Sequence, residues 1–401
     1  MKAEDALFSR RGVLAGGALA ILSPQVVRGS QANSKISVGL IGSGGRGSYD
    51  AAMVNADPRA RVTALCDLYD DRLERAAQQI KAPEAKLYKD FEKLLASPDI
   101  DAVVIATPPF EHPRMLEAAV EAGKHVYCEK PAGVDLEGVK RVIAAGRKCD
   151  PKKNISFGFQ QRYGPVYLEA YKRFKEGQIG SLTNARGFWI DRDPFTRVPY
   201  PDPKVEKLRN WFAYREYSGD FIVEQDCHNL DVLHWFLDAH PIRAVGMGGR
   251  KVRTDMEILD HLTLSYEFPN GIHVNFEANQ ISPAGFRRVG EEFTGTAGLL
   301  ETSRGRMVHH KSAKDIETME SKRDITNDAI EAFLGRVESG DVENVAERSA
   351  VSTLFAILGR TAIYENREAV WKAEFGDIGA VAKKFIGSSV PRFLGSQACN
   401  G

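Results

Sequence analysis

Short apolar runs alternate with amphipathic segments along the first part of the chain. The expected strands cover residues 36–41, 60–66, 102–106, 125–128 and 155–159. The segments between them have the period of helices and cover residues 48–56, 70–79, 112–122 and 136–148. Continuous apolar runs separated by helices are typical of parallel strands that are buried on both faces. The pattern predicts a doubly wound α/β domain over residues 35–160.

Strand candidates then follow one another without helices between them. They cover residues 184–190, 261–268, 272–278, 292–295 and 299–302, and the second and third read as a hairpin with one apolar face. Helices are expected at 166–175, 229–237, 328–336 and 345–364. A long surface loop is expected at 191–209. Residues 161–380 are therefore predicted to form an α+β domain with an open, mostly antiparallel sheet, and 381–401 a tail. The last helices are expected to pack back on one of the two domains.

A glycine-rich turn joins the first expected strand to the first expected helix. It reads Gly42-Ser43-Gly44-Gly45-Arg46-Gly47, which has the GxGxxG spacing of a dinucleotide-binding turn. Gly42 permits the sharp turn, Gly44 lets the main chain approach a pyrophosphate, and Gly47 allows the helix to pack closely on the strand. The N–H groups at the helix start would then bind the phosphates. The sequence predicts a Rossmann-type domain that binds a dinucleotide.

The second expected strand ends in Asp67, about 20 residues after the last glycine. A carboxylate at this spacing binds the ribose hydroxyls and repels a 2′-phosphate, so NAD is expected rather than NADP. Arg46 in the same loop is the feature that would instead favour the 2′-phosphate of NADP.

Composition excludes several classes of protein. The chain has 401 residues, of which 43% are hydrophobic and 27% charged, as in an ordinary soluble globular protein. Lys+Arg and Asp+Glu both number 54, so the zero net charge gives no general attraction for nucleic acid or an anionic membrane. The five cysteines include no CxxC pair and suggest neither a disulfide framework nor a zinc site.

The first residues have the features of an export signal. Arg10 and Arg11 precede a short, modestly apolar stretch that runs to Val27. A twin arginine before such a stretch is typical of a Tat signal, which is predicted over residues 1–34. The protein is then expected to use the Tat machinery and to work in the periplasm or otherwise outside the cytoplasm. The alternative is a disordered basic leader.

Five motifs together resemble the Gfo/Idh/MocA oxidoreductases, in that family's order. They are Ala106-Thr107-Pro108-Pro109 with His112, Ala122-Gly123-Lys124-His125-Val126, Glu129-Lys130-Pro131, Gly219 to Asp231, and Phe293-Thr294-Gly295-Thr296-Ala297-Gly298. The similarity spans roughly residues 35–375. It implies an NAD(P) oxidoreductase that acts on a sugar, with Lys130 as the catalytic lysine and His228 as the catalytic histidine. The family's usual Asp and Gly before the histidine are Glu224 and Asp226 here.

Physical arguments support the two catalytic candidates. Lys130 follows a strand and precedes a proline, at the rim of the sheet where ligands bind in open α/β folds. Desolvation there is expected to lower its pKa, so that it exchanges a proton with a hydroxyl. His228 lies four residues after Glu224, which would place both on one helix face. Glu224 is the third catalytic candidate. The alternatives are a surface lysine and a core histidine satisfied by Asp231.

Other residues are assigned to the cofactor and the substrate. Thr107, Pro108 and His112 are expected to line the nicotinamide side of the cofactor, and the alternative is that they form a helix cap and loop. Glu129 and Lys130 are also expected to bind the cofactor. The substrate candidates are Arg162, Tyr163 and Asp231. No metal is expected, although Glu224, Asp226, His228 and Asp231 include ligand types that suit a divalent ion.

The function predicted from these features is an exported NAD(P)-dependent oxidoreductase of a carbohydrate or polyol. Because a periplasm should offer little free NAD, the cofactor is expected to be tightly bound and restored within each cycle. One alternative is a redox-neutral NAD-dependent glycosidase that oxidises, eliminates and reduces again. A second is an inactive cofactor-binding protein. A homo-oligomer formed through the open sheet is also expected.

Overall fold

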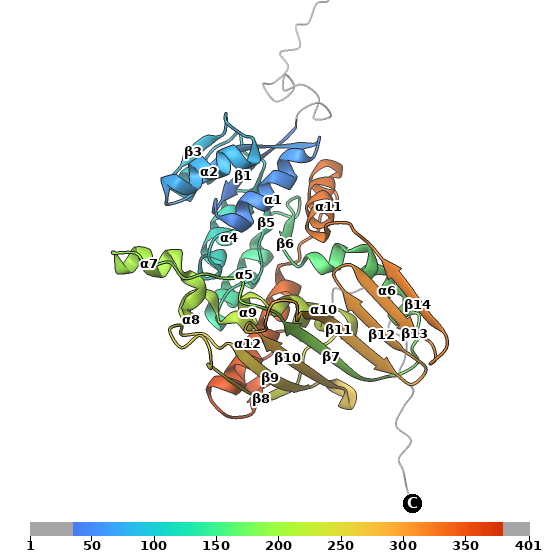
Figure 1. The fold of residues 1–401 in the computed structure, drawn as a ribbon. Coiled ribbons are helices and arrows are strands. Elements are labelled where there is room, and N and C mark those ends of the chain that lie inside the picture. Colours follow the sequence, from blue (N-terminus) through green and yellow to red (C-terminus); the bar gives the residue numbers. More distant parts are fainter. Residues whose placement is uncertain (1–34, 380–401) are drawn as a thin grey trace, which may run out of the picture. The chain divides into compact units, whose positions relative to one another are not determined.

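The first sheet of the computed structural model is six-stranded and wholly parallel (Figure 1). The structure describes residues 35–379. In the order β3-β2-β1-β4-β5-β6, the strands are β1 Ile36–Ile41, β2 Ala60–Cys66, β3 Lys86–Tyr88, β4 Ala102–Ile105, β5 His125–Cys128 and β6 Ile155–Phe157. Their connecting helices are α1 Gly45–Ala56, α2 Asp70–Ile80, α3 Phe91–Leu95, α4 His112–Glu121 and α5 Leu136–Lys148. This confirms the predicted Rossmann-type fold, whose strand order reverses between β1 and β4.

The second sheet has nine strands and is mixed, mostly antiparallel, as predicted. Its order is β14-β13-β12-β11-β7-β10-β9-β8-β15. The strands are β7 Leu182–Ile190, β8 Arg243–Gly249, β9 His261–Glu267, β10 His273–Asn279, β11 Arg288–Gly295, β12 Leu299–Ser303, β13 Arg306–His310, β14 Ile316–Glu320 and β15 Ala369–Val370. The hairpin β9–β10 has its expected apolar face, with Leu264 opposite Phe276 and both buried. The parallel pair is β7 with β10.

Helices that follow β6 in the chain complete both cores. They are α6 Pro165–Lys175, α7 Pro203–Arg209, α8 Arg215–Ser218, α9 Phe221–Glu224, α10 Cys227–Leu237, α11 Ile325–Ser339, α12 Ala346–Tyr364 and α13 Trp371–Phe375. Ile330 and Phe333 of α11 are fully buried in one cluster with Val38 and Leu40 of β1. Helix α12 packs against α5, the helix that connects β5 to β6, and against α10 and β8 of the second half of the fold. The domain boundaries themselves stay a prediction.

The segment 191–209 is only partly the loop expected. Residues 203–209 form helix α7, because Pro203 occupies its first position and the Asp202 carboxylate accepts a hydrogen bond from the N–H of Lys204. The predicted export signal and the tail lie outside the described residues.

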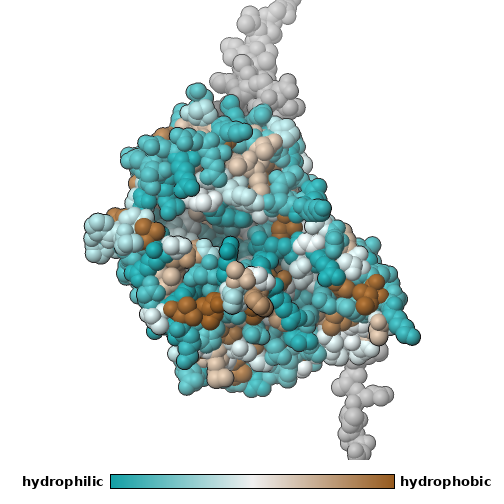
Figure 2. All heavy atoms as spheres, in the orientation of Figure 1, coloured by the Kyte–Doolittle hydropathy of each residue, from teal (hydrophilic) through white to brown (hydrophobic). Residues whose placement is uncertain are grey.

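The surface is predominantly hydrophilic on the face drawn in Figure 2, with hydrophobic residues in small separate patches. On this face a recess separates the part that carries α1 and α2 from the part that carries the nine-stranded sheet (Figures 1 and 2). Within residues 35–379, no helix has the length and apolar character needed to cross a bilayer.

Candidate active site

The glycine turn after β1 has the geometry that a pyrophosphate requires. Gly42 has a φ of 94°, and a Cβ there would lie 2.7 Å from the main chain of Ala106. A Cβ on Gly47 would lie 2.0 Å from the carbonyl oxygen of Gly42, so helix and turn can approach only with glycine. Gly44 precedes α1 and provides no side-chain cap, which leaves the first N–H groups of the helix available to an anion. Gly45 faces open space. The turn therefore fits a dinucleotide.

Asp67 organises the same turn from the end of β2. Its Oδ2 accepts a hydrogen bond from the N–H of Ser43 at 2.9 Å, and its Oδ1 accepts one from the N–H of Tyr69 at 3.0 Å. The carboxylate thus lies beside the glycine turn, where the ribose of a bound dinucleotide is expected. Arg72 reaches the same turn, since a Cβ on Gly44 would come within 2.6 Å of its Nη1.

Arg46 and Glu129 bind each other. The Nη2 and Nε atoms of Arg46 lie 2.7 and 3.0 Å from Oε1 of Glu129, and Nε lies 3.2 Å from Oδ1 of Asp50. Burial alone would lower the pKa of Arg46, but these two carboxylates raise it above its ordinary value. The N–H of Lys130 donates to Oε2 of Glu129 at 3.2 Å. Glu129 therefore connects the start of α1 to the turn that carries Lys130.

Lys130 pairs with Glu224. Its Nζ lies 2.8 Å from Oε1 of Glu224 and 2.5 Å from the carbonyl oxygen of the same residue, and the two side chains are 12% and 13% exposed. Burial alone would lower the pKa of Lys130, but the Glu224 carboxylate raises it above its usual value. The expectation of a lysine with a lowered pKa is therefore wrong, because the sequence does not reveal this close counter-charge.

His228 lies among aromatic side chains, and no carboxylate of residues 35–379 is paired with it. Its ring stacks on Trp189 at 6.0 Å between centroids and meets the edge of Phe159 at 6.4 Å. Its Nδ1 is buried and has no hydrogen-bond partner among residues 35–379. Burial, followed by the positive charges of Lys130, Arg304 and Arg46, lowers the pKa of His228 well below its usual value. The imidazole is therefore neutral at neutral pH.

The expected shared helix face of Glu224 and His228 does not form. Helix α9 ends at Glu224 and α10 begins at Cys227, so two separate helices carry the two residues. Glu224 still reaches the site, because the break in the helix turns it toward Lys130.

His112 is buried between two turns, and its place on the nicotinamide side stays a prediction. It is 1% exposed, and its Nδ1 and Nε2 lie 2.8 and 2.9 Å from the carbonyl oxygens of Pro131 and Thr107. It therefore links the turn after β4 to the turn after β5. The hydroxyl of Thr107 donates to the sulfur of Met115 at 3.4 Å, and Pro108 precedes a short 3₁₀ turn.

The three substrate candidates have partners of their own. Arg162 forms a two-pronged ion pair with Asp231, with 2.8 Å from Nε to Oδ2 and from Nη2 to Oδ1, and both side chains are largely buried. The Oγ of Ser352 also donates to Asp231 at 2.6 Å. The Tyr163 hydroxyl accepts from Nη2 of Arg336 at 3.3 Å. None of these contacts reaches Lys130 or His228.

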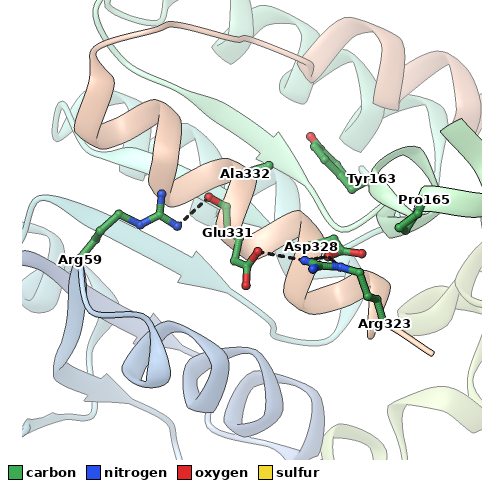
Figure 3. Close-up of a pocket in the computed structure, with 7 residues that line it drawn as sticks. All are labelled: Arg59, Tyr163, Pro165, Arg323, Asp328, Glu331 and Ala332. Carbon is green, nitrogen blue, oxygen red and sulfur yellow. Dashed lines mark hydrogen bonds and ion pairs between the residues drawn. The ribbon is translucent and has the colours of Figure 1, made fainter. Parts of the chain in front are cut away.

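Tyr163 also lines a surface pocket of about 580 Å³ beside α11 (Figure 3). The other lining residues are Arg59, Pro165, Arg323, Asp328, Glu331 and Ala332. Their charges pair with one another, since Arg323 contacts Asp328 and Glu331 (Figure 3).

Arg209 of α7 reaches the cofactor side and was not anticipated from the sequence. Its Nη1 and Nη2 lie 2.9 and 2.5 Å from the carboxylate oxygens of Asp71, and its guanidinium stacks 3.9 Å from the centre of the Tyr69 ring. Tyr69 and Asp71 lie two and four residues after Asp67 in the sequence. The segment 191–209 is thereby fixed beside the residues expected to hold the ribose. The sequence carried no signal for a contact between residues 138 positions apart.

Two profiles of one family match the chain. The oxidoreductase family with an NAD-binding Rossmann fold matches residues 36–152, and the GFO/IDH/MocA C-terminal domain matches residues 167–301. The scyllo-inositol 2-dehydrogenase (NAD(+)) of Bacillus subtilis is 29% identical over 287 residues, which cover 70% of this chain and 78% of the relative. The chain therefore belongs to the Gfo/Idh/MocA oxidoreductase family, which confirms the resemblance of the motifs.

Solved structures agree on the fold. A myo-inositol 2-dehydrogenase from Lactobacillus plantarum superposes with a TM-score of 0.69 at 21% identity, over 84% of this chain and 99% of that one. A levoglucosan dehydrogenase in complex with NADH gives a TM-score of 0.72 at 19% identity over the same shares.

Proposed function

We propose that this member of the family is an NAD-dependent oxidoreductase that moves a hydride between a sugar or polyol and nicotinamide. The observation that carries the proposal is the set of contacts around the two catalytic candidates, an ion pair on Lys130 and a buried Nδ1 of His228 without a partner among residues 35–379. Lys130 is a charged acid paired with Glu224, and His228 is a neutral base with a free Nδ1. The inositol and levoglucosan dehydrogenases among the similar proteins support a polyhydroxylated substrate.

The two residues have complementary roles in this proposal. NAD, when bound to the glycine turn, supplies the hydride acceptor. Lys130 stays protonated because of Glu224, so it donates a hydrogen bond to the substrate oxygen and stabilises negative charge that develops there. His228 is neutral and accepts the hydroxyl proton at Nδ1. In the reverse direction, the imidazolium returns that proton.

NAD is proposed as the cofactor rather than NADP. The carboxylate of Asp67 beside the glycine turn would repel a 2′-phosphate. The Arg46 guanidinium, which could otherwise favour a phosphate, is held by Glu129 and Asp50. Arg72 also lies near the turn, and its contribution is tested by comparing the affinities of Arg72→Gln for the two cofactors.

Export through the Tat machinery and retention of the cofactor are proposed together. The twin arginine Arg10-Arg11 supports export, since this pair is read by a receptor. The contact of Arg209 with Asp71 supports retention, because it fixes a segment of the second half of the chain beside the ribose site. An exported enzyme that keeps its NAD must restore it in each cycle, either by paired oxidation and reduction or by redox-neutral cleavage of a glycoside.

The experiment starts with the mature protein purified without added cofactor. We expect bound NAD(H) in its absorbance spectrum, and turnover of a sugar, polyol or aryl glycoside. Lys130→Ala should retain the fold and the NAD, and should lose about 10²–10⁴-fold in turnover. Near-wild-type rates in this variant would refute the catalytic assignment. Turnover that needs NAD in the buffer and yields one NADH per product would refute the closed cycle only.

The open face of the nine-stranded sheet is proposed to bind a second copy of the chain. It carries a groove of about 380 Å³ with both charge signs on its walls, from Arg288 and Arg306 to Glu292 and Glu301. Such a mixed surface can complement itself across a two-fold axis. Sedimentation of the mature protein tests this, and a monomer at micromolar concentration would refute it.

A further inference from the structure

Arg304 lies in the turn between β12 and β13 without a counter-ion. No hydrogen bond or ion pair joins its side chain to any residue in the described part of the chain, and its Nε is buried without a partner. Its guanidinium carbon lies 5.8 Å from the centre of the Trp189 ring, and that ring stacks on His228. Arg304 and His228 thus share one aromatic neighbour. A free guanidinium therefore lies within the candidate active site.

We infer that Arg304 binds a carboxylate of the substrate, so that the substrate class is an acidic sugar such as a uronic acid or its glycoside. This rests on the proposed function, and it names which sugars the site accepts. The planar fork of a guanidinium matches the two oxygens of a carboxylate, and a neutral sugar would leave the partly buried charge uncompensated.

The other cations of the site already have partners. Lys130 is paired with Glu224, and Arg46 with Glu129. The charges that act on His228 are Lys130, Arg304 and Arg46, and all three are positive. Arg304 differs from Lys130 and Arg46 because it has no ion-pair partner among the described side chains. The site is therefore electropositive around His228.

Within residues 35–379 no carboxyl group forms an ion pair with Arg304, although the charge of Asp324 attracts it. Glu291 is fully buried and accepts a hydrogen bond from the Thr302 hydroxyl at 2.6 Å, and burial raises the pKa of Glu291 to about 8. It is therefore largely uncharged at neutral pH. Asp324 accepts hydrogen bonds from the Tyr49 hydroxyl and, at 2.9 Å, from the N–H of Thr326. The remaining groups that act on Arg304 are Tyr167, Arg46 and Arg287, of which the two arginines repel it.

The pyrophosphate of a bound dinucleotide is the second possible source of an anion. The free N–H groups at the start of α1 already provide a site for it, and Trp189 places Arg304 on the His228 side. The two sources predict different effects of the same substitution. Loss of a contact to a substrate carboxylate lowers kcat/KM for acidic sugars only. Loss of a contact to the pyrophosphate weakens the binding of NAD.

The test compares glucuronate with glucose, and galacturonate with galactose, on the NAD-loaded enzyme. The wild type should prefer the acidic member of each pair at least tenfold in kcat/KM. Arg304→Gln should lower kcat/KM for the acidic member roughly 10- to 150-fold and leave the neutral one within twofold. Arg304→Lys should restore part of the loss. The control is Lys314→Gln in the neighbouring turn between β13 and β14, an exposed cation whose replacement should change kcat/KM for neither member of a pair.

Three results would overturn the inference. They are equal turnover of both members by the wild type, an equal loss for both members in Arg304→Gln, and a tenfold weaker NAD dissociation constant in that variant. If none of the sugars turns over, the proposed function fails separately. Calorimetric titration of glucuronate into the NADH-loaded protein then decides. Binding that Arg304→Gln abolishes supports the carboxylate site, and no binding to the wild type refutes it.

Discussion

Replacing Glu224 by Gln should expose the electrostatic basis of the candidate site. The substitution keeps the size of the side chain and removes the charge that faces Lys130 at 2.8 Å. At this distance, and with an effective dielectric constant of about 20, the attraction between the two charges is about 6 kcal/mol. Desolvation of both groups offsets part of it, and removal of one partner from a buried pair typically costs about 3–5 kcal/mol. We therefore expect the free energy of unfolding at pH 7 to fall by about 3 kcal/mol.

The pH dependence gives the sharper test. In the wild type, Glu224 raises the pKa of Lys130, so the stability from this pair is fully present below the unfolded pKa of about 10.4. In Glu224→Gln, burial remains and the pKa of Lys130 falls below that of the unfolded chain. Unfolding then takes up a proton, and the variant gains stability as the pH rises, by at most about 1.4 kcal/mol per pH unit.

Urea unfolding at pH 7, 8 and 9 measures this difference. The gap between wild type and Glu224→Gln should narrow with rising pH. Glu224→Asp keeps the charge and should retain part of the stability, and Glu277→Gln on the exposed side of β10 should have no effect. A variant within about 0.5 kcal/mol of the wild type at pH 7, with a constant gap up to pH 9, would refute the pairing.

Three further predictions concern the cofactor and acid stability. Asp67→Asn should weaken NAD and narrow its advantage over NADP, and an unchanged ratio of the two dissociation constants would exclude a ribose contact. Arg209→Ala should speed the release of bound NAD in stopped-flow chase experiments, whereas Lys204→Ala, on the exposed start of α7, should not. His234 has a pKa lowered by burial to about 3, so unfolding takes up a proton below pH 6.5 and stability falls with pH, by at most about 2 kcal/mol at pH 5. His234→Gln should reduce this acid sensitivity, and an unchanged slope between pH 6.5 and 5 would contradict the assignment.

The parallel sheet could be predicted from the sequence because its strands are buried on both faces. Strand β4 is apolar throughout, and β1, β2 and β5 are mostly apolar and buried, which is a strong local signal. The strands that the pattern missed lack this signal. Every second residue of β14 is exposed and the others are half-buried, and β8 contains three glycines among seven residues. These strands form because neighbouring strands pair with them, which no local pattern reveals.

In the candidate site, too, some features could be predicted from local sequence and others could not. Motifs selected Lys130, which lies two residues after the end of β5, and His228, which is the second residue of α10. The partners of these residues depend on tertiary contacts. Glu224 reaches Lys130 because the chain breaks between α9 and α10, and Arg162 binds Asp231 across 69 positions. Helical periodicity predicted a contact between Glu224 and His228 and missed both of these pairs.

The charge states of Lys130 and His228 bear on the choice between one-way and closed-cycle chemistry. A one-way dehydrogenase must pass the hydroxyl proton to solvent in each turnover. In a closed cycle, the proton that His228 accepts during oxidation is the proton needed for the later reduction, and Lys130 keeps its charge throughout. The burial that lowers the pKa of His228 makes its imidazolium a strong acid, ready to return the proton. The same burial slows exchange of that proton with water. A site of this kind would serve both directions of hydride transfer without net release of a proton to solvent, which suits the retained cofactor that we propose.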